Sequence, residues 1–368
     1  MPETHDIIET HPLTHEQIPI RTAINEFVDS ARLETFRQLN TCSDPVGPTT
    51  IATHESLTRQ TVSSHLTDLV SVGLVNHDSD KTHYWLTAGG VIALTATERC
   101  LEKIARDQLS TLTRTSQSLL LLRTLGTRSV DLRDLSLKSD TPSQTTLWRI
   151  VQDFAEFGWV AKQSGRYELL APGERALTAY EEFEETIVQC IKKAPFLQRL
   201  DPTLLEGDNP FPVDALADAK LVFSGPDSPG LAVGAAIKLA DPQINRVRIL
   251  TSVFTPTLLR LYHKLVSFGM TGEGVIDASV YEHLVETEDL HYVLDSARYD
   301  HYRLYRLDEP LALGLAIYDV AKVSVGAYNK VGEGQHVAVI ISTNEDLVDW
   351  GLNSYRSYRD QAMLTEAV

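Results

Sequence analysis

The stretch from Thr49 to Gly90 constrains the fold more than any other part of the chain. Apolar residues near helical spacing define two helical segments, separated by a short polar break. The side chain of Thr58 can cap the start of the second segment, and Gly73 can end it. Residues 74–75 and 84–86 then have the character of two short strands around a polar tip. This order of helix, turn, helix and hairpin predicts a winged helix-turn-helix domain.

The face of the second helix that lies opposite its apolar stripe carries small donors and acceptors and one guanidinium group. Such groups suit phosphates and the edges of bases in the major groove. The candidate DNA-contacting residues of this domain, two of them in the wing, are Thr58, Arg59, Gln60, Thr61, Ser63, Ser64, Lys81 and His83. Gln60 has the geometry to pair with adenine, and Arg59 with guanine or phosphate. The alternative for the same residues is the solvated face of an ordinary helical hairpin.

The string TVSSHLTDLVSVGLV, which begins at Thr61, resembles the signature of ArsR- and MarR-like winged-helix regulators of bacteria and archaea. The resemblance covers the second helix and the first strand of the expected wing. It implies a DNA-binding regulator of transcription.

The next segment of the chain repeats the first. Placing Gly158 on Gly73 gives an offset of 85 residues, at which apolar positions, glycines and the order of elements match. We therefore expect a first winged helix with its connecting helix over 21–113 and a second over 114–194. The candidate DNA-contacting residues of the second are Ser143, Gln144, Thr145, Arg149, Lys162 and Arg166. Trp148 lies near that face and fits a protein contact better than groove reading, so the first domain is expected to dominate specificity.

Several further segments carry expectations of their own. Residues 1–20 are polar and predict a flexible tail, and residues 23–39 predict one amphipathic helix. Residues 91–113 predict a long amphipathic helix, which either packs on its own domain or pairs with a second subunit. A short helix is expected over 130–137, and four prolines predict an irregular linker over 194–213.

From Ala219 onward strands and helices alternate, and four strands followed by a helix close the chain. This pattern predicts a mixed α/β sheet with helices on its faces, within a domain over 195–368. The fold class expected for the chain is α+β, with tandem winged helix-turn-helix domains followed by a mixed α/β sensor domain.

Two strings in this half, LALGLAIYDVAKVSVGAYN from Leu311 and HVAVIISTNEDLVDWGLNSYRSYRDQA from His336, resemble the end of the middle domain of the methanogenesis regulatory protein family. In that family the domain sits behind winged helices in archaeal transcription regulators. The resemblance therefore implies an effector or dimerisation domain. Regulators with a TrmB-like or phospholipase-D-like sensor domain are the nearest alternative.

The residues that catalysis would need are not found in the required patterns. Phospholipase-D chemistry needs a His nucleophile with Lys two residues on, and a second His for acid–base work. His263 is followed directly by Lys264, and His301 has Arg303 in the place of that Lys. The sequence has no GxSxG, P-loop or HExxH motif, and its three cysteines lie far apart. We expect no enzyme activity, no metal and no cofactor.

Aromatic and cationic residues are unusually dense between Tyr292 and Arg306. Arg and Tyr side chains can bind a small anion through charge-assisted and phenolic hydrogen bonds. The candidate ligand-binding residues are Tyr299, Tyr302, Arg303 and Arg306. A strand whose tyrosines pack while its arginines pair with surface carboxylates is the alternative.

Acidic residues exceed basic ones throughout the chain, with a net charge of −17 that divides into −7 over residues 1–195 and −10 over the rest. Duplex DNA repels acid, so a basic patch does not support DNA binding here. Few Lys and many Asp, Glu and Thr resemble proteins of halophilic archaea, in which concentrated salt screens this repulsion. No apolar run approaches the ~20 residues of a membrane span, and the start lacks a signal peptide, so a cytoplasmic protein without a membrane partner is expected.

Together these patterns predict a sequence-specific transcription regulator that binds double-stranded DNA as a homodimer. A small anionic effector or dimerisation through the C-terminal domain would set its DNA affinity. The rival is an interaction protein in which tandem winged helices bind other proteins without reading DNA.

Overall fold

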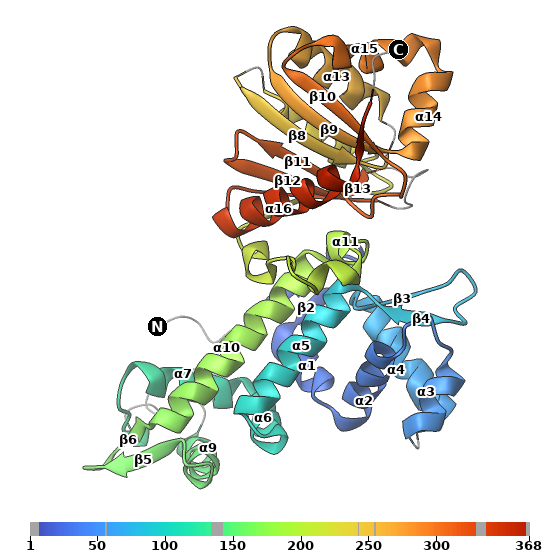
Figure 1. Ribbon diagram of the computed structural model, residues 1–368. Helices are drawn as coiled ribbons and strands as arrows, with labels where there is room; N and C mark the ends of the chain where they lie inside the picture. Colours follow the sequence, from blue (N-terminus) through green and yellow to red (C-terminus); the bar gives the residue numbers. More distant parts are fainter. Residues whose placement is uncertain are drawn as a thin grey trace. The chain divides into compact units, whose positions relative to one another are not determined.

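The computed structural model describes residues 7–55, 57–133, 143–241, 243–253, 255–328 and 336–365. The chain divides into two compact units, Met1–Lys192 and Lys193–Val368, which Figure 1 shows in the colours of the sequence. The fold class is α+β: the first unit is mainly helical, and the second is built on an eight-stranded mixed sheet.

The N-terminal unit begins with a hairpin and a first set of helices and strands. In chain order the elements are β1 (Ile8–Thr10), β2 (Gln17–Pro19), α1 (Ile20–Phe27), α2 (Ser30–Thr41), α3 (Pro48–Glu55), α4 (Arg59–Ser71), β3 (Val75–His77) and β4 (Tyr84–Leu86). Over residues 7–20 the hairpin corrects the expectation of a flexible tail over 1–20, because His11 is buried at its turn and accepts a hydrogen bond from the backbone N–H of Thr14. The single helix expected over 23–39 is also wrong. The chain breaks after α1, since Asp29 caps α2 by accepting from the backbone N–H groups of Ala31 and Arg32.

The first set ends with α5 (Ala88–Lys103), and a second set follows in the same unit. Its elements are α6 (Arg106–Thr113), α7 (Ser116–Thr127), α9 (Gln144–Glu156), β5 (Val160–Gln163), β6 (Arg166–Leu169) and α10 (Ala171–Lys192). The long helix expected over 91–113 is interrupted, because Ile104 and Ala105 adopt extended backbone conformations between α5 and α6. Helix α5 packs against α10 of its own chain (Figure 1). Most of the short helix expected over 130–137 lies outside the described residues.

The two sets of elements share their backbone details, which supports the duplication inferred from the sequence. Thr58 caps α4 and Ser143 caps α9, at the offset of 85 residues. Both helices end at a glycine with positive φ, 78° at Gly73 and 70° at Gly158.

The hairpins of the two sets are also joined to the rest of each set in the same way. Val46 pairs with Tyr84, and Val130 pairs with Tyr167, each through two backbone hydrogen bonds. Each set therefore adds a short third strand to its β hairpin, before α3 in the first set and before α9 in the second.

In each set, a glycine after the hairpin lies close to the backbone of the residue that follows the helix-ending glycine. An added Cβ at Gly90 would lie 2.1 Å from the carbonyl oxygen of Leu74, and one at Gly173 would lie 2.5 Å from that of Trp159. Leu74 and Trp159 are the residues that follow the two helix-ending glycines. Only a residue without a side chain fits this approach between backbones.

The C-terminal unit is a mixed sheet with strand order β14-β10-β9-β8-β11-β12-β13-β7. Its strands are β7 (Lys220–Phe223), β8 (Arg246–Thr251), β9 (Thr271–Asp277), β10 (Tyr302–Leu307), β11 (Gly314–Tyr318), β12 (Lys322–Tyr328), β13 (His336–Ser342) and β14 (Met363–Leu364). Strands β8, β9 and β10 run parallel, and the remaining neighbours pair antiparallel. The parallel strands come from the alternating part of the sequence, since parallel neighbours need crossover helices.

Helices cover both faces of this sheet (Figure 1). They are α11 (Ala194–Leu197), α12 (Leu231–Leu239), α13 (Pro256–Ser267), α14 (Ala278–Glu286), α15 (His291–Asp295) and α16 (Glu345–Gln361). Helices α13, α14 and α15 pack on the face to which Tyr302 and Leu304 point, and α16 packs on the opposite face, against Val323 and Leu315.

The segment expected as an irregular linker over 194–213 packs on α16 instead. Phe211 makes an edge contact with the ring of Trp350, with ring centroids 5.0 Å apart. The Trp350 ring N–H donates to the carbonyl oxygen of Asn209 at 3.1 Å, and the amide of Asn209 donates back to the carbonyl oxygen of Trp350 at 3.2 Å. These contacts fix the segment although its prolines exclude a long helix.

Candidate nucleic-acid interface and ligand cavity

Helix α4 presents its N-terminal face to solvent, as the sequence predicts. Arg59, Gln60 and Ser64 are exposed, and Ser63 is half-buried. Thr58 and Thr61 are tied to each other, with their hydroxyl oxygens 2.8 Å apart. The apolar stripe of the same helix, Val62, Leu66 and Leu69, is fully buried. The side chains that remain open for a partner are therefore those of the first turn.

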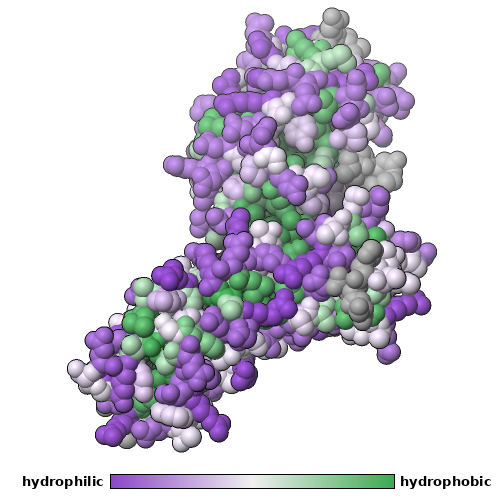
Figure 2. All heavy atoms as spheres, turned by 60° about the horizontal axis from the view of Figure 1, so that its bottom comes forward, coloured by the Kyte–Doolittle hydropathy of each residue, from purple (hydrophilic) through white to green (hydrophobic). Residues whose placement is uncertain are grey.

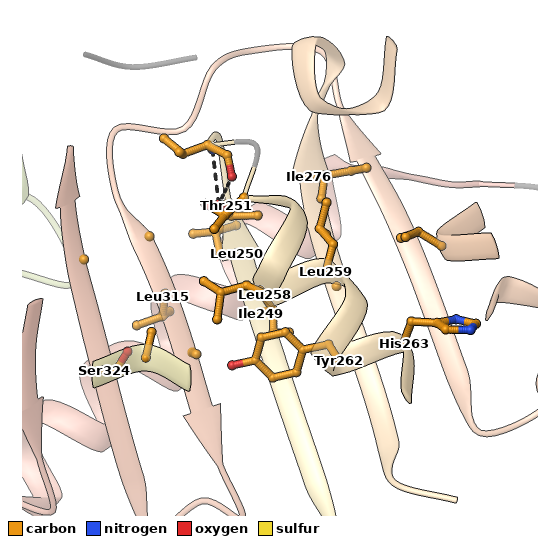
Figure 3. A pocket seen from close by; sticks show the side chains of 18 of the residues that line it. Ile249, Leu250, Thr251, Leu258, Leu259, Tyr262, His263, Ile276, Leu315 and Ser324 are labelled. Atoms are coloured by element: carbon orange, nitrogen blue, oxygen red, sulfur yellow. Dashed lines mark hydrogen bonds between the residues drawn. The ribbon is translucent and has the colours of Figure 1, made fainter. Parts of the chain in front are cut away.

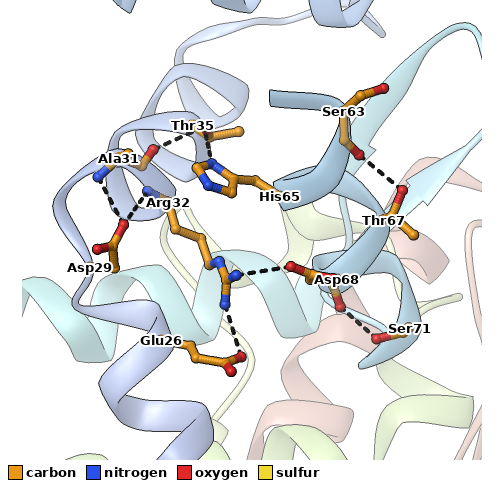
Figure 4. Close-up of polar contacts among 10 residues, drawn as sticks. All are labelled: Glu26, Asp29, Ala31, Arg32, Thr35, Ser63, His65, Thr67, Asp68 and Ser71. Atoms are coloured by element: carbon orange, nitrogen blue, oxygen red, sulfur yellow. Dashed lines mark hydrogen bonds and ion pairs between the residues drawn. The ribbon is translucent and has the colours of Figure 1, made fainter. Parts of the chain in front are cut away.

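Charged and polar contacts hold α4 against α1 and α2 (Figure 4). The guanidinium of Arg32, on α2, donates to Asp68 on α4 and to Glu26 on α1, both at 2.8 Å. His65, also on α4, lies 3.2 Å from the hydroxyl of Thr35, and its partial burial lowers the pKa of its ring. Both contacts lie on the side of α4 that faces α2, so they orient the helix without using its exposed first turn.

The hairpin of β3 and β4, the expected first wing, is acidic at its tip. The side chain of Asp78 accepts from the backbone N–H and the hydroxyl of Thr82, and lies 2.9 Å from the ring Nδ1 of His83. These hydrogen bonds hold the pKa of Asp78 well below its ordinary value. Lys81 is exposed and has a positive φ of 55°. Of the two predicted wing contacts, Lys81 points to solvent and His83 is paired within the wing.

Helix α9 of the second set presents an equivalent first turn. Gln144, Thr145 and Arg149 are exposed, and Ser143 is occupied in capping, since its hydroxyl accepts from Thr146 N–H at 3.2 Å. Trp148 is 53% exposed, which is unusual for so large an apolar side chain. The sequence correctly placed Trp148 near the face that carries the polar candidates.

The two predicted contacts in the hairpin of β5 and β6 differ in their surroundings. Lys162 is exposed and lies over the ring of Tyr167, 5.4 Å from its centroid. Arg166 donates to the hydroxyl and the carbonyl oxygen of Ser129, at 3.0 and 2.7 Å. Arg166 thus helps to hold the third strand of its own set, and Lys162 is the freer cation.

The two sets differ in charge, although the chain as a whole is strongly acidic. Residues 30–86 contain four Lys and Arg against six Asp and Glu, whereas residues 116–170 contain seven against six. Figure 2 shows hydrophilic residues over most of the face that it presents, with apolar residues in patches between them. On charge alone, the second set is the better match for a polyanion.

The four predicted ligand-binding residues do not form one site. The ring of Tyr302 is buried under α13, whereas Arg303 is exposed and, by strand alternation, lies on the opposite face of the sheet. Arg306 lies over the ring of Tyr281, at 5.2 Å, and pairs with Asp308. Tyr299 is 38% exposed and lies before β10. An anion at any one of them would lack the other three.

A cavity of about 80 Å³ lies between the sheet and α13 (Figure 3). Its apolar walls include Ile249, Leu258, Leu259 and Ile276. Tyr262 and Tyr318 share a hydrogen bond of 2.8 Å between their hydroxyl groups, and His263 lies 2.7 Å from the hydroxyl of Ser296. Burial lowers the pKa of His263 and raises those of the two tyrosines, so all three are uncharged near neutral pH.

The sequence did not point to this cavity. Its residues come from six strands and four helices, and their sequence pattern is that of any buried sheet. Tyr302 is the one predicted ligand-binding residue that lines it. The signal that could have been noticed is the recurrence of glycine at Gly274, Gly314 and Gly326 within three strands.

The described residues show no cluster that could hold a metal ion. Cys100 and Cys190 are buried free thiols, and burial raises the pKa of each to about 12. His263 contacts the hydroxyl of Ser296, and His301 lies 2.9 Å from the carbonyl oxygen of Val266. In the part of the chain that the structure describes, no helix has the length and apolar character of a membrane span.

Two segments of the chain match known domain families. Residues 237–361 match the family described as methanogenesis regulatory protein FilR1, middle domain. This confirms the resemblance inferred from the strings at Leu311 and His336. Residues 106–190, which span the second set of helices and strands, match the family described as HVO_A0261 N-terminal domain. No curated protein matches the chain.

Solved structures give looser similarities. A phospholipase D family member, Nuc from Salmonella typhimurium, aligns at 16% identity over 40% of this chain and 99% of its own, with a TM-score of 0.33. TrmBL2, an archaeal chromatin protein, aligns at 13% identity over 74% of this chain and 100% of its own, with a TM-score of 0.32. NucT from Helicobacter pylori aligns at 14% identity over 39% of this chain and 97% of its own, with a TM-score of 0.32. The family matches, and not these alignments, connect the chain to a domain of a regulatory protein.

Proposed function

We propose that the chain is a sequence-specific DNA-binding regulator of transcription. Its N-terminal unit would be a tandem pair of winged helix-turn-helix domains, and α4 and α9 their recognition helices. The observation that carries the proposal is that both sets have the same arrangement of helix, glycine and hairpin. In each set, a hydroxyl-capped helix ends at a left-handed glycine, leads into a β hairpin, and exposes a polar first turn.

The exposed side chains of these first turns suit contacts with DNA. Gln60 and Gln144 can pair with adenine in the major groove, and Arg59 and Arg149 with guanine or phosphate. Lys81 and Lys162 lie in the two hairpins and suit the neighbouring backbone phosphates. The acidic surface elsewhere would be screened by concentrated salt in a haloarchaeal cytoplasm.

The first domain was expected to dominate specificity. Because the second set is the less acidic one, we assign it an equal part in binding. Binding would be by a homodimer, since a helix-turn-helix gains affinity when two-fold symmetry presents it to two half-sites. The C-terminal unit would modulate this binding and would have no enzyme activity.

The test compares single variants of the full chain on a selected DNA site. We expect Gln60→Ala and Gln144→Ala each to relax preference at one base pair, at a cost of about 1–3 kcal/mol. Gln17→Ala, an exposed change on β2, is the matched control and should bind like the parent. If all three proteins bind like the parent, the two helices do not read bases.

A second candidate function rests on Trp148. An exposed tryptophan on α9 is typical of a protein contact, so the second set could dock on another protein while α4 alone reads DNA. Trp148→Ser separates the two: unchanged DNA affinity with loss of a partner protein would favour docking, and weakened DNA affinity would favour direct binding.

A further inference from the structure

The cavity under α13 has features of a binding site beyond its volume. Its floor is made of small residues on three strands: Gly274 on β9, Gly314 and Ala316 on β11, and Ser324 and Gly326 on β12. The strand register sets Gly314 opposite Gly326 and Ala316 opposite Ser324, so the small positions are continuous across β11 and β12. Ile249 on β8 separates them from Gly274. Buried sheets ordinarily fill such positions with branched side chains.

Polar aromatic side chains lie against two glycines of this floor. An added Cβ at Gly274 would lie 3.0 Å from the hydroxyl of Tyr302, and one at Gly326 would lie 2.7 Å from Nδ1 of His336. The glycines therefore leave room for these two rings at the rim of the cavity, and both rings line it.

The Nδ1 atom of the His336 ring is buried and has no hydrogen-bond partner among the described residues. Burial lowers the pKa of the ring to about 4, so the imidazole is neutral at physiological pH. A neutral imidazole has one donor and one acceptor nitrogen, and a buried polar atom without a partner costs about 1–3 kcal/mol. A bound molecule with a hydrogen-bonding group would remove that cost.

Charge decides what kind of molecule the cavity can take. None of the described residues that line it is Asp, Glu, Lys or Arg. An anion would enter without a counter-charge, which is unfavourable in an apolar space. The volume of about 80 Å³ is several times the ~10–15 Å³ that holds one water, which suits a compact molecule on the order of one ring.

We propose that the C-terminal unit binds a small, uncharged, mainly apolar molecule in this cavity, with its single polar group hydrogen-bonded to His336 or Tyr302. This replaces the small anion expected from the sequence. Binding of the small molecule in the cavity does not depend on the proposed function. Only the effect of that molecule on DNA affinity rests on the proposed function. A ligand that prefers one arrangement of the protein would shift that affinity, and one without a preference would not.

The experiment measures binding to the full chain by calorimetry, with three probes of one ring size and no DNA present. Phenol offers the ring and a hydroxyl, toluene the ring alone, and benzoate the ring with a charge. We expect phenol to bind most tightly, toluene more weakly, and benzoate not at all. Tightest binding of benzoate, or no binding of phenol and toluene, would overturn the proposal.

Two variants locate the site. Ala316→Leu places a branched side chain on the cavity floor and should abolish phenol binding, whereas Ala217→Leu, the same change at an exposed position, should not. His336→Phe keeps a ring but removes the polar atoms, and should weaken phenol about tenfold while leaving toluene unchanged. Equal binding by the parent and both cavity variants would place the probes elsewhere and refute the assignment. DNA binding is measured separately on the same proteins. A failure of probe binding can therefore be told apart from a failure of DNA binding.

Discussion

Acidification should destabilise the C-terminal unit through His336. The pKa of this ring is about 4 in the folded chain against 6.5 for the unfolded value, so the unfolded state binds the proton more tightly. The stability is therefore intact above pH 6.5 and is lost as the pH falls from 6.5 towards 4. The difference corresponds to about 3 kcal/mol once both states are protonated, and to about 2 kcal/mol at pH 5. Close neighbours bury the ring and so lower its pKa. The centroids of the His336 and Tyr328 rings are 4.8 Å apart, and Nδ1 of His336 faces Gly326.

The assay is urea unfolding of the parent and of His336→Gln, at pH 8, 7, 6 and 5 in constant salt. The comparison at pH 8 gives the packing cost of the substitution, because the native ring is then neutral. From pH 8 to pH 5 the parent should lose about 2 kcal/mol more than the variant. Both proteins also lose some stability on acidification through His263, because burial lowers the pKa of that ring too. An equal loss of unfolding free energy in the parent and the variant would refute the account of His336 as a buried neutral ring.

Three further predictions test the fold and the assembly. Gly90→Ala should destabilise the N-terminal unit by at least about 2 kcal/mol in thermal unfolding, because its Cβ would lie 2.1 Å from the carbonyl oxygen of Leu74; Gly225→Ala, with open space around it, is the control. Val320→Gly should stabilise the chain by about 1 kcal/mol in urea unfolding, since Val320 has a positive φ of 59° in the turn between β11 and β12, and an unchanged or lower stability would contradict this. Light scattering in concentrated salt should give twice the 40.9 kDa of one chain, and a single-chain mass at all concentrations would exclude the homodimer.

Local signals in the sequence predicted the N-terminal unit well. The cap at Thr58 and the helix-ending Gly73 and Gly158 depend on neighbouring residues only, and all three lie where they were expected. Ser143, expected as a DNA contact, caps α9 instead. The alternation of strands and helices after Ala219 likewise gave the elements of the C-terminal sheet. Such features need no knowledge of distant contacts.

Features set by tertiary contacts could not be predicted. The break between α5 and α6 follows from the burial of Ile104, which an amphipathic pattern does not distinguish from a helical position. The dispersal of Tyr302, Arg303 and Arg306 follows from strand alternation and from pairing with Asp308. The cavity depends on strand order, because β8 separates β9 from β11 and brings Gly274 and Ala316 onto one floor.

Whether the chain recognises a DNA sequence is tested most directly by selection from a random duplex pool with the full chain, followed by footprinting on the selected site. The selection is repeated at several salt concentrations, because phosphate contacts weaken as salt rises. We predict an enriched motif with two related half-sites, and protection of both half-sites on the footprint. A pool that stays random at every salt concentration would contradict the proposal that the N-terminal unit reads DNA.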